Sequence, residues 1–322
     1  MTRVLLLGGT GFVGRHVCEK LARLLWPVTV VTRRSSHAQH LQPLSLITVL
    51  PGDVHDEATL RRLLPGHDAV VNLVAMLHGN AVAFERTHVE LPAKLAKACM
   101  AAGVKRLVHV SAIGADDSNP EAAPSLYLRS KSRGEAVLRA AAANGLQLTV
   151  LRPSVIFGAE DRFLNLFARL QKLFLFIPLA GAQARFQPVW VEDVAQAVVQ
   201  CLQQPATIGQ TYELCGPSVY TLKQLVQLAG RAAGVNHGRG RPVIPLPMVL
   251  GRLQALLMEL TPGQPLMSRD NLDSMRVANV ASGRLPGLAA LGITPAALTA
   301  IAPGYLGQND LNLLRRSQYG RH

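Results

Sequence analysis

Cysteine is scarce and widely spaced in this chain of 322 residues. The four cysteines are Cys18, Cys99, Cys201 and Cys215, so no Cys-x-x-Cys pair occurs. This spacing argues against a disulfide framework and against a zinc site. The ten histidines are also scattered along the chain. We therefore expect no metal site.

Long apolar runs are absent as well. The densest, at 173–182, is far shorter than the roughly 20 residues that a membrane-spanning helix needs. The apolar run in the first seven residues is too short for a signal peptide. Hydrophobic residues make up 49% and charged residues 16%, a balance that excludes a disordered chain. The composition predicts a folded, soluble, cytoplasmic protein.

Acidic residues and aromatics are the other scarce groups. The chain has 20 acidic and 33 basic residues, which gives a net charge of +13, and aromatics make up only 5%. The basic residues are spread as singles and pairs, and no aromatic pattern provides a base-stacking platform. We therefore predict no nucleic-acid binding. Anionic lipid or a phosphorylated ligand remains as an explanation for the charge.

Short apolar segments alternate with helical patterns through the first half of the chain. We expect strands at 4–7, 28–32, 47–50, 69–75, 106–111 and 148–153, and helices at 14–25, 57–64, 91–102 and 127–144. Continuous apolar strands separated by helices indicate a parallel sheet covered on both faces. The fold class is therefore α/β, a doubly wound Rossmann sheet. We expect this domain at 1–155 and a small, mainly helical C-terminal lobe at 156–322 with segments that return to the sheet.

A glycine series directly follows the first expected strand. Glycine at 8, 11 and 14 permits a tight turn and a close approach of the backbone to a pyrophosphate, and a helix then begins. The glycines alone would also fit a tight turn, but the strand before them and the helix after them favour dinucleotide binding. The candidate contact residues are Gly8, Thr10, Gly11, Phe12, Val13 and Gly14.

The end of the second expected strand indicates which dinucleotide is bound. An acidic residue there would receive the ribose hydroxyl of NAD, but this chain has Arg33 and Arg34. Guanidinium groups favour a 2′-phosphate, so we predict NADP(H) in preference to NAD(H). The alternative is that both arginines are solvated. Asp53 and Val54 follow the third strand, and Asp53 is placed to accept a hydrogen bond from an adenine amino group.

Tyr127 and Lys131 lie four residues apart on an expected helix, and this spacing puts both on one face. An ammonium beside a phenol lowers the pKa of the phenol and makes it a usable general acid or base. The alternative is an ordinary surface pair. The position of this helix, one element after the strand that ends at Ser111, favours the catalytic interpretation.

Taken together, these motifs and the segment 151–153 resemble an extended short-chain dehydrogenase/reductase. The segments 152–163, 185–194 and 211–217 are similar to one atypical branch, which contains the NADPH-binding accessory subunit of respiratory complex I and its bacterial relatives. The resemblance covers about residues 3–230.

The resemblance implies that Tyr127 acts as acid/base with Lys131 as its partner, and that Lys131 also holds the nicotinamide ribose. It places Ala75 and Pro153 in the cofactor pocket. The catalytic hydroxyl departs from the family pattern, because Ala112 and Ile113 stand where it is expected. Ser111 is then the candidate. His88 also departs, since the family commonly has asparagine there.

Three functions follow from the resemblance. The first is an NADP(H)-dependent reductase of a carbonyl, and the second a non-catalytic NADPH-binding subunit or assembly factor of a respiratory complex. The third, a sugar-nucleotide epimerase or dehydratase, is disfavoured by the missing hydroxyls and by the expected NADP(H) preference. No pattern in the sequence identifies the substrate.

The segment 246–260 is a candidate contact surface. It has a helical pattern and is apolar almost all round. Such a helix should be covered, either in the core of the small lobe or by a partner or an interfacial membrane surface. The last alternative would place the protein at the periphery of the inner membrane.

Overall fold

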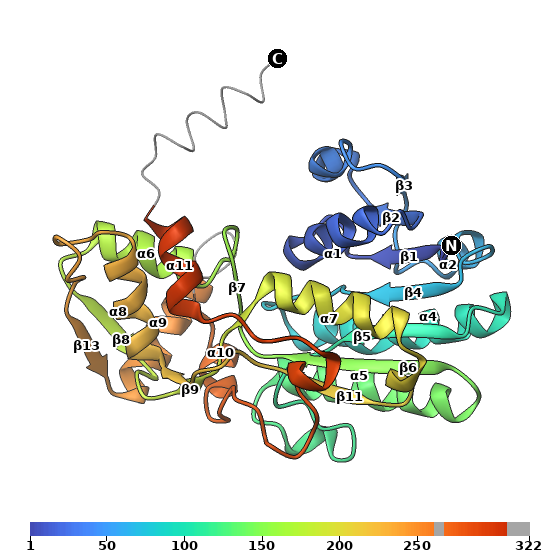
Figure 1. Ribbon diagram of the computed structural model, residues 1–322. Coiled ribbons are helices and arrows are strands. Elements are labelled where there is room, and N and C mark those ends of the chain that lie inside the picture. The colour runs from blue at the N-terminus through green and yellow to red at the C-terminus, as the bar shows by residue number, and fades with distance from the viewer. Residues whose placement is uncertain (261–266, 308–322) are drawn as a thin grey trace.

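The computed structural model describes residues 1–260 and 267–307. Its centre is a seven-stranded parallel sheet in the order β11-β6-β5-β4-β1-β2-β3. In Figure 1 these strands lie one below another, from β3 at the top to β11 at the bottom, with helices packed against the sheet. The strands are β1 (Val4–Leu7), β2 (Val28–Thr32), β3 (Ile47–Pro51), β4 (Ala69–Asn72), β5 (Arg106–Val110), β6 (Gln147–Pro153) and β11 (Thr211–Leu214).

Apolar side chains fill both faces of the sheet, so the central strands β1, β4 and β5 are buried at every position. One core cluster joins the sheet to α1 (Phe12–Arg23) and α7 (Val191–Gln203). The second joins it to α2 (Glu57–Leu63), α4 (Leu91–Ala102) and α5 (Leu126–Ala143). The doubly wound Rossmann fold is therefore confirmed.

The largest differences from the expected elements lie around β4. The strand expected at 69–75 ends at Asn72, whose Oδ1 accepts a hydrogen bond from the Val74 amide at 3.1 Å. The helix expected at 91–102 is preceded by α3 (Ala81–Glu85) and by one π-helical segment, η2 (Arg86–Glu90). These two short helical segments thus follow the carboxyl end of β4, at the edge of the sheet where ligands of this fold bind.

A smaller lobe packs at that edge around its own apolar cluster. Its helices are α6 (Leu164–Leu173), α8 (Leu222–Ala232), α9 (Met248–Glu259), α10 (Arg269–Ser274) and α11 (Leu298–Leu306). Its short strands are β7 (Ile156–Phe157), β8 (Ile177–Ala180), β9 (Arg185–Phe186), β10 (Val189–Trp190), β12 (Tyr220–Thr221) and β13 (Val243–Leu246). Between these, α7 and β11 return to the main sheet, where β11 pairs with β6. The 3-10 turns are η1 (Ser35–Leu41), η3 (Pro120–Ala122), η4 (Pro205–Thr207) and η5 (Leu288–Leu291).

The C-terminal segment 246–260 does not lie in the core of the lobe. In α9 only Gly251 and Ala255 are buried, whereas Val249 is 79% and Leu257 58% exposed. Burial in the protein's own core, one of the two alternatives for this segment, is therefore wrong. Among the residues that the structure describes, no helix is long and apolar enough to cross a membrane.

Candidate functional site

The glycine turn after β1 leaves no room for larger residues. Gly8 adopts a φ of +83°, in the region that favours glycine. A Cβ atom on Gly14 would lie 2.3 Å from the Gly8 carbonyl oxygen. Helix α1 begins at Phe12, and its N-cap residue Gly11 provides no side-chain cap, so the first amides of the helix remain available to an anion. This geometry suits the binding of a pyrophosphate.

A cavity of about 1520 Å³ opens from this turn and continues into the small lobe. Two thirds of the predicted site residues line it: Gly8, Thr10, Gly11, Phe12, Val13, Gly14, Ala75, Ser111, Tyr127 and Pro153. They come from the carboxyl ends of β1, β4, β5 and β6 and from α5. The parallel sheet explains this convergence, because its carboxyl strand ends share one edge.

The other predicted residues lie outside the lining of this cavity. Arg33 and Arg34 follow β2 and are exposed. Asp53 accepts a hydrogen bond from the His55 amide at 3.0 Å. Val54 packs against the second core cluster.

Tyr127 faces the cavity, but its pKa differs from the expectation. Burial, together with the nearby carboxylate of Asp270, raises the pKa of Tyr127 to about 12. The expected lowering by Lys131 is therefore wrong for the cofactor-free protein. The phenol ring is held edge-on by Phe84 and His88, with ring centroids 6.1 and 5.5 Å away.

Lys131 is buried beneath the cavity and directs its ammonium group to the sheet. Its Nζ donates a hydrogen bond to the Val110 carbonyl oxygen at 2.9 Å. Burial lowers the pKa of Lys131 to about 8. An ammonium has three donor protons, so one hydrogen bond leaves donors for a ligand such as a ribose.

Ser111 carries an unsatisfied hydroxyl in the cavity wall. The residue is 5% exposed, and its Oγ has no hydrogen-bond partner among residues 1–260 and 267–307. Its neighbours Ala112 and Ile113 are buried and offer no hydroxyl. A buried hydroxyl without a partner carries a desolvation penalty of about 1–3 kcal/mol, which a bound polar group would relieve.

His88, which departs from the family pattern, anchors the wall beside Tyr127. Its Nε2 accepts a hydrogen bond from the Met76 amide at 3.1 Å, so Nδ1 carries the proton and donates to Ser130 Oγ at 2.8 Å. Ser130 Oγ in turn donates to the Tyr127 carbonyl oxygen at 2.7 Å. Burial, with the charge of Lys131, lowers the pKa of His88 to about 2, so the ring stays neutral. His88 thus fixes both the cavity wall and the start of α5.

A buried ion pair holds α5 against β6. Arg152 Nε lies 3.1 Å from both carboxylate oxygens of Glu135, and Arg152 Nη2 contacts Asp117 at 2.7 Å. Glu135 is fully buried. On the same helix, Gly134 passes the His88 carbonyl so closely that a Cβ would lie 1.9 Å from its oxygen. These contacts position Tyr127 and Lys131 relative to the cavity.

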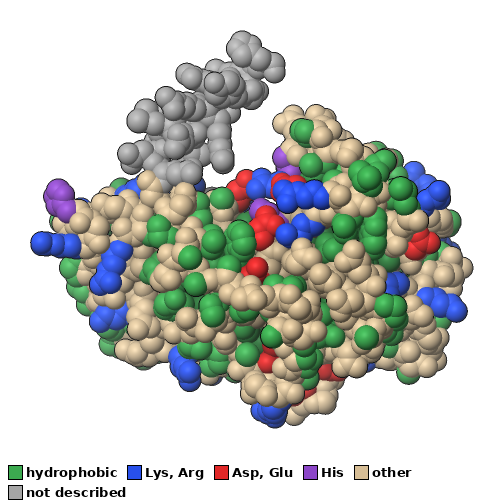
Figure 2. Space-filling model, in the orientation of Figure 1, with side chains coloured by type: hydrophobic (Ala, Val, Ile, Leu, Met, Phe, Trp, Pro, Cys, Tyr) green, Lys and Arg blue, Asp and Glu red, His purple; other side chains and the backbone are tan. Residues whose placement is uncertain are grey.

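The predicted site residues do not include several polar residues on the opposite side of the cleft. Arg15, His40, Glu160 and Arg162 all line the cavity. Arg15 on α1 forms an ion pair with Glu160 in the loop after β7, and so links the sheet to the lobe. Figure 2 shows acidic and basic side chains gathered in the hollow between these two parts. The sequence held two signals for these residues: Arg15 directly follows the glycine series, and the charges at 160–162 suggested a structural ion pair or cap.

One group of metal-type ligands occurs elsewhere. His16, Glu19 and Glu192 bring their ligand atoms within 4.8 Å of one another in the described part of the chain. Glu192 already pairs with His16 at 2.6 Å and with Lys20 at 2.9 Å. The group therefore joins α1 to α7 as an ion-pair cluster.

The residues present fit a nicotinamide dinucleotide. The glycine cradle and the uncapped start of α1 suit a pyrophosphate, and the spare donors of Lys131 suit a ribose. Fold and site together define an extended short-chain dehydrogenase/reductase. Residues 4–215 match the sequence model of the NAD dependent epimerase/dehydratase family, and the chain belongs to that family.

Three known proteins illustrate what the chain is similar to. The chain is 33% identical over 298 residues to the mouse mitochondrial NADH dehydrogenase [ubiquinone] 1 alpha subcomplex subunit 9, which covers 90% of this chain and 76% of that protein. It is 30% identical over 206 residues to a ceramide reductase of Caulobacter vibrioides, and the match covers 63% of this chain and 61% of that protein. The structure of DesIV, a dTDP-glucose 4,6-dehydratase of Streptomyces venezuelae solved with NAD, matches with a TM-score of 0.65 and 25% sequence identity. This match covers 76% of this chain and 84% of DesIV.

Proposed function

We propose that this protein binds NADP(H) in the cavity and reduces the carbonyl group of a small molecule. The unpartnered Ser111 hydroxyl carries the proposal, because it stands in the wall of the cavity that Tyr127 also lines. A purely structural cofactor pocket would have no need for a buried, unsatisfied hydroxyl at that position.

The chain's own residues have distinct tasks in this reaction. A bound dihydronicotinamide dinucleotide supplies the hydride. The turn at Gly8–Gly14 holds the pyrophosphate, and Lys131 holds the ribose with its remaining donors. Ser111 Oγ donates a hydrogen bond to the carbonyl oxygen, and Tyr127 gives that oxygen its proton. The same proposal places Asp53 at the adenine, and Ala75 and Pro153 at the nicotinamide.

The preference for NADP(H) rests on Arg33 and Arg34, which are exposed at the end of β2 where the ribose 2′ position is read. We expect the double charge reversal R33E/R34E to raise the Kd for NADPH by about 100-fold, because each charge-assisted hydrogen bond contributes about 1.5–3 kcal/mol. Binding of NADH, which lacks the phosphate, should change little. Fluorescence titration of both nucleotides measures this.

R23E is the matched control, since Arg23 is exposed at the far end of α1. It should leave the NADPH affinity unchanged. Equal loss in R23E and R33E/R34E would point to the net charge of the protein, and no loss in either would make the two arginines a solvated pair.

A second candidate function is that of an accessory or assembly subunit of a respiratory NADH:quinone oxidoreductase at a membrane surface. The mouse relative that is 33% identical is by its name a subunit of a mitochondrial NADH dehydrogenase. An exposed apolar surface supports it: Leu173 is 75% exposed, and Leu250 and Leu257 on α9 are 51% and 58% exposed. Contiguous apolar patches of this kind mark protein or membrane contacts. Basic residues, scattered over the face in Figure 2, would favour an anionic lipid surface.

Native fractionation of gently lysed source cells tests this second candidate. We expect the untagged wild-type protein to migrate with a large membrane complex, and the variant L250Q/L257Q to lose that association. V82Q, on an exposed apolar residue of α3, is the control and should stay bound. Migration of the wild type as a small soluble species would contradict the subunit function.

A further inference from the structure

The cavity continues into the small lobe, where most of its lining is apolar, with Arg162, Gln254, Asn271, Ser274 and Asn279 among the polar exceptions. In the small lobe its wall is formed by Leu166, Leu170 and Leu173 of α6. These positions recur at spacings of four and three, so they form one face of α6 for about 10 Å. Residues 174–179 of the following turn and β8 continue this wall.

The volume also exceeds the requirement of one ligand. Sites for single small molecules occupy roughly 300–1,000 Å³. The cavity here measures about 1520 Å³. A second molecule therefore has room beside the cofactor, in a cavity that Ser111, directly after β5, and Tyr127, on α5, both line.

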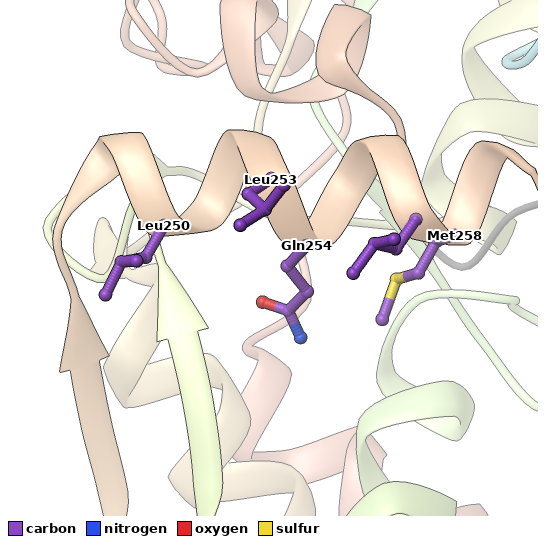
Figure 3. A pocket seen from close by; sticks show the side chains of 5 residues that line it. Leu250, Leu253, Gln254 and Met258 are labelled. Atoms are coloured by element: carbon purple, nitrogen blue, oxygen red, sulfur yellow. The ribbon is translucent and has the colours of Figure 1, made fainter.

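The outer end of the cavity is bordered by α9. Gln254 and Met258 line both the cavity and a shallow groove of about 390 Å³ along this helix. Figure 3 shows Leu250, Gln254 and Met258 projecting from the same side of α9. The opposite border is the turn after α6, where Leu175 is 73% exposed. The cavity thus opens between two borders that are mostly apolar, with Gln254 as the polar residue on the α9 side.

We infer that the second molecule is an amphiphile with one long apolar chain and a carbonyl group near its polar end. This rests on the proposed function. The carbonyl lies between Ser111 and Tyr127, and the chain runs along α6 to the opening beside α9. A sugar nucleotide fits this wall poorly, because its hydroxyls and phosphates would face leucines without hydrogen-bond partners.

The reaction balances with one proton taken up from the solvent. The carbonyl carbon receives a hydride from the dihydronicotinamide, so one C–H bond breaks on the cofactor and one forms on the substrate. The oxygen receives the proton of Tyr127, which is then restored from water. The products are a long-chain secondary alcohol and the oxidised dinucleotide.

Two measurements on the full chain loaded with NADPH test the inference. The first is NADPH oxidation with the methyl ketones 2-hexanone, 2-octanone, 2-decanone and 2-dodecanone. The second is binding of cis-parinaric acid, a fluorescent long-chain probe that needs no turnover. We expect the apparent affinity to rise about fourfold for each added methylene, because burial of one methylene contributes about that factor.

Variants locate the chain within the cavity. L170Q places an amide in the wall along α6. It should lower the ratio of the apparent affinities for 2-dodecanone and 2-hexanone by at least tenfold. L173Q makes the same change at the exposed border, where folding is not at risk. V249Q is the control, since Val249 is an exposed residue of α9 that does not line the cavity.

The outcomes separate the inference from the proposed function. If the protein binds the probe, L173Q weakens this binding and no ketone causes NADPH oxidation, the apolar ligand site is supported and the reductase function is overturned. Ketone reduction that is independent of chain length and unaffected by L170Q and L173Q supports the reductase and overturns the inference. NADPH binding without either signal contradicts both.

Discussion

Replacement of Gly14 by alanine will abolish dinucleotide binding and leave the sheet folded. The new Cβ would lie 2.3 Å from the Gly8 carbonyl oxygen and 2.5 Å from Gly9 Cα, so the turn must move away from α1. The displaced backbone amides then lose at least two charge-assisted hydrogen bonds to phosphate. At about 1.5–3 kcal/mol each, this loss raises the Kd for NADPH by about 100-fold or more. Isothermal titration measures the Kd, and far-ultraviolet circular dichroism reports the fold.

The matched control is Gly304→Ala in α11. A Cβ on Gly304 would meet no atom within 4 Å, so the substitution should preserve NADPH affinity and leave stability unchanged or slightly higher. Full NADPH affinity in G14A would contradict the assignment of the pyrophosphate to this turn. Unfolding of G14A would be seen in the dichroism spectrum. In that case G11A, whose Cβ meets only the Gly8 carbonyl oxygen at 3.2 Å, provides the milder test of the same turn.

Local sequence was sufficient to predict the half of the site on the Rossmann sheet. The turn at Gly8–Gly14 depends on neighbours within one strand and one helix, and a parallel sheet brings all its carboxyl strand ends to one edge. The positions of Ala75, Ser111 and Pro153 around one cavity follow from that topology. Fold class and cofactor class were therefore predictable without knowledge of tertiary contacts.

Electrostatics and the second wall of the cavity were not predictable in this way. The four-residue spacing places Tyr127 and Lys131 on one helix, but the direction of the ammonium depends on the Val110 carbonyl of a distant strand. Contact between Arg15 and Glu160 joins residues 145 positions apart, and no local pattern specifies it. His88 illustrates the same limit, because its partners Met76 and Ser130 meet only in the folded chain.

Helix α9 shows why an apolar pattern alone does not determine burial. Its sequence is apolar almost all round, which is typical of a covered helix. Only the two smallest side chains face the lobe: a Cβ on Gly251 would come within 2.2 Å of Ala180 Cβ, and Ala255 is fully buried. Small residues give close contact with β8, and the large side chains then lie outside. The number of leucines in a helix therefore does not predict which of its faces is buried.

Tyr127→Phe should abolish carbonyl reduction and leave cofactor binding intact. The substitution keeps the aromatic ring that packs against Phe84 and His88 and removes only the hydroxyl. Loss of a positioned proton donor lowers the rate by about 100- to 10,000-fold. Single-turnover oxidation of NADPH with a reducible ketone measures the rate, and the Kd for NADPH should stay within about twofold of the wild type because the phenol is not a phosphate or ribose ligand. Tyr220→Phe, outside the cavity, is the control.

The pH dependence distinguishes Tyr127 from Lys131. The pKa of Tyr127 is about 12 in the free protein, so the phenol keeps its proton throughout the assay range, and its ionisation does not limit reduction. The pKa of Lys131 is about 8, so this side chain is charged below that pH and neutral above it. Because the ammonium provides the donors for the ribose, NADPH affinity should weaken as the pH rises through about 8, while the single-turnover rate with saturating NADPH stays level to about pH 10. A fall in that rate near pH 10 that Tyr127→Phe removes would instead assign an ordinary phenol pKa to Tyr127.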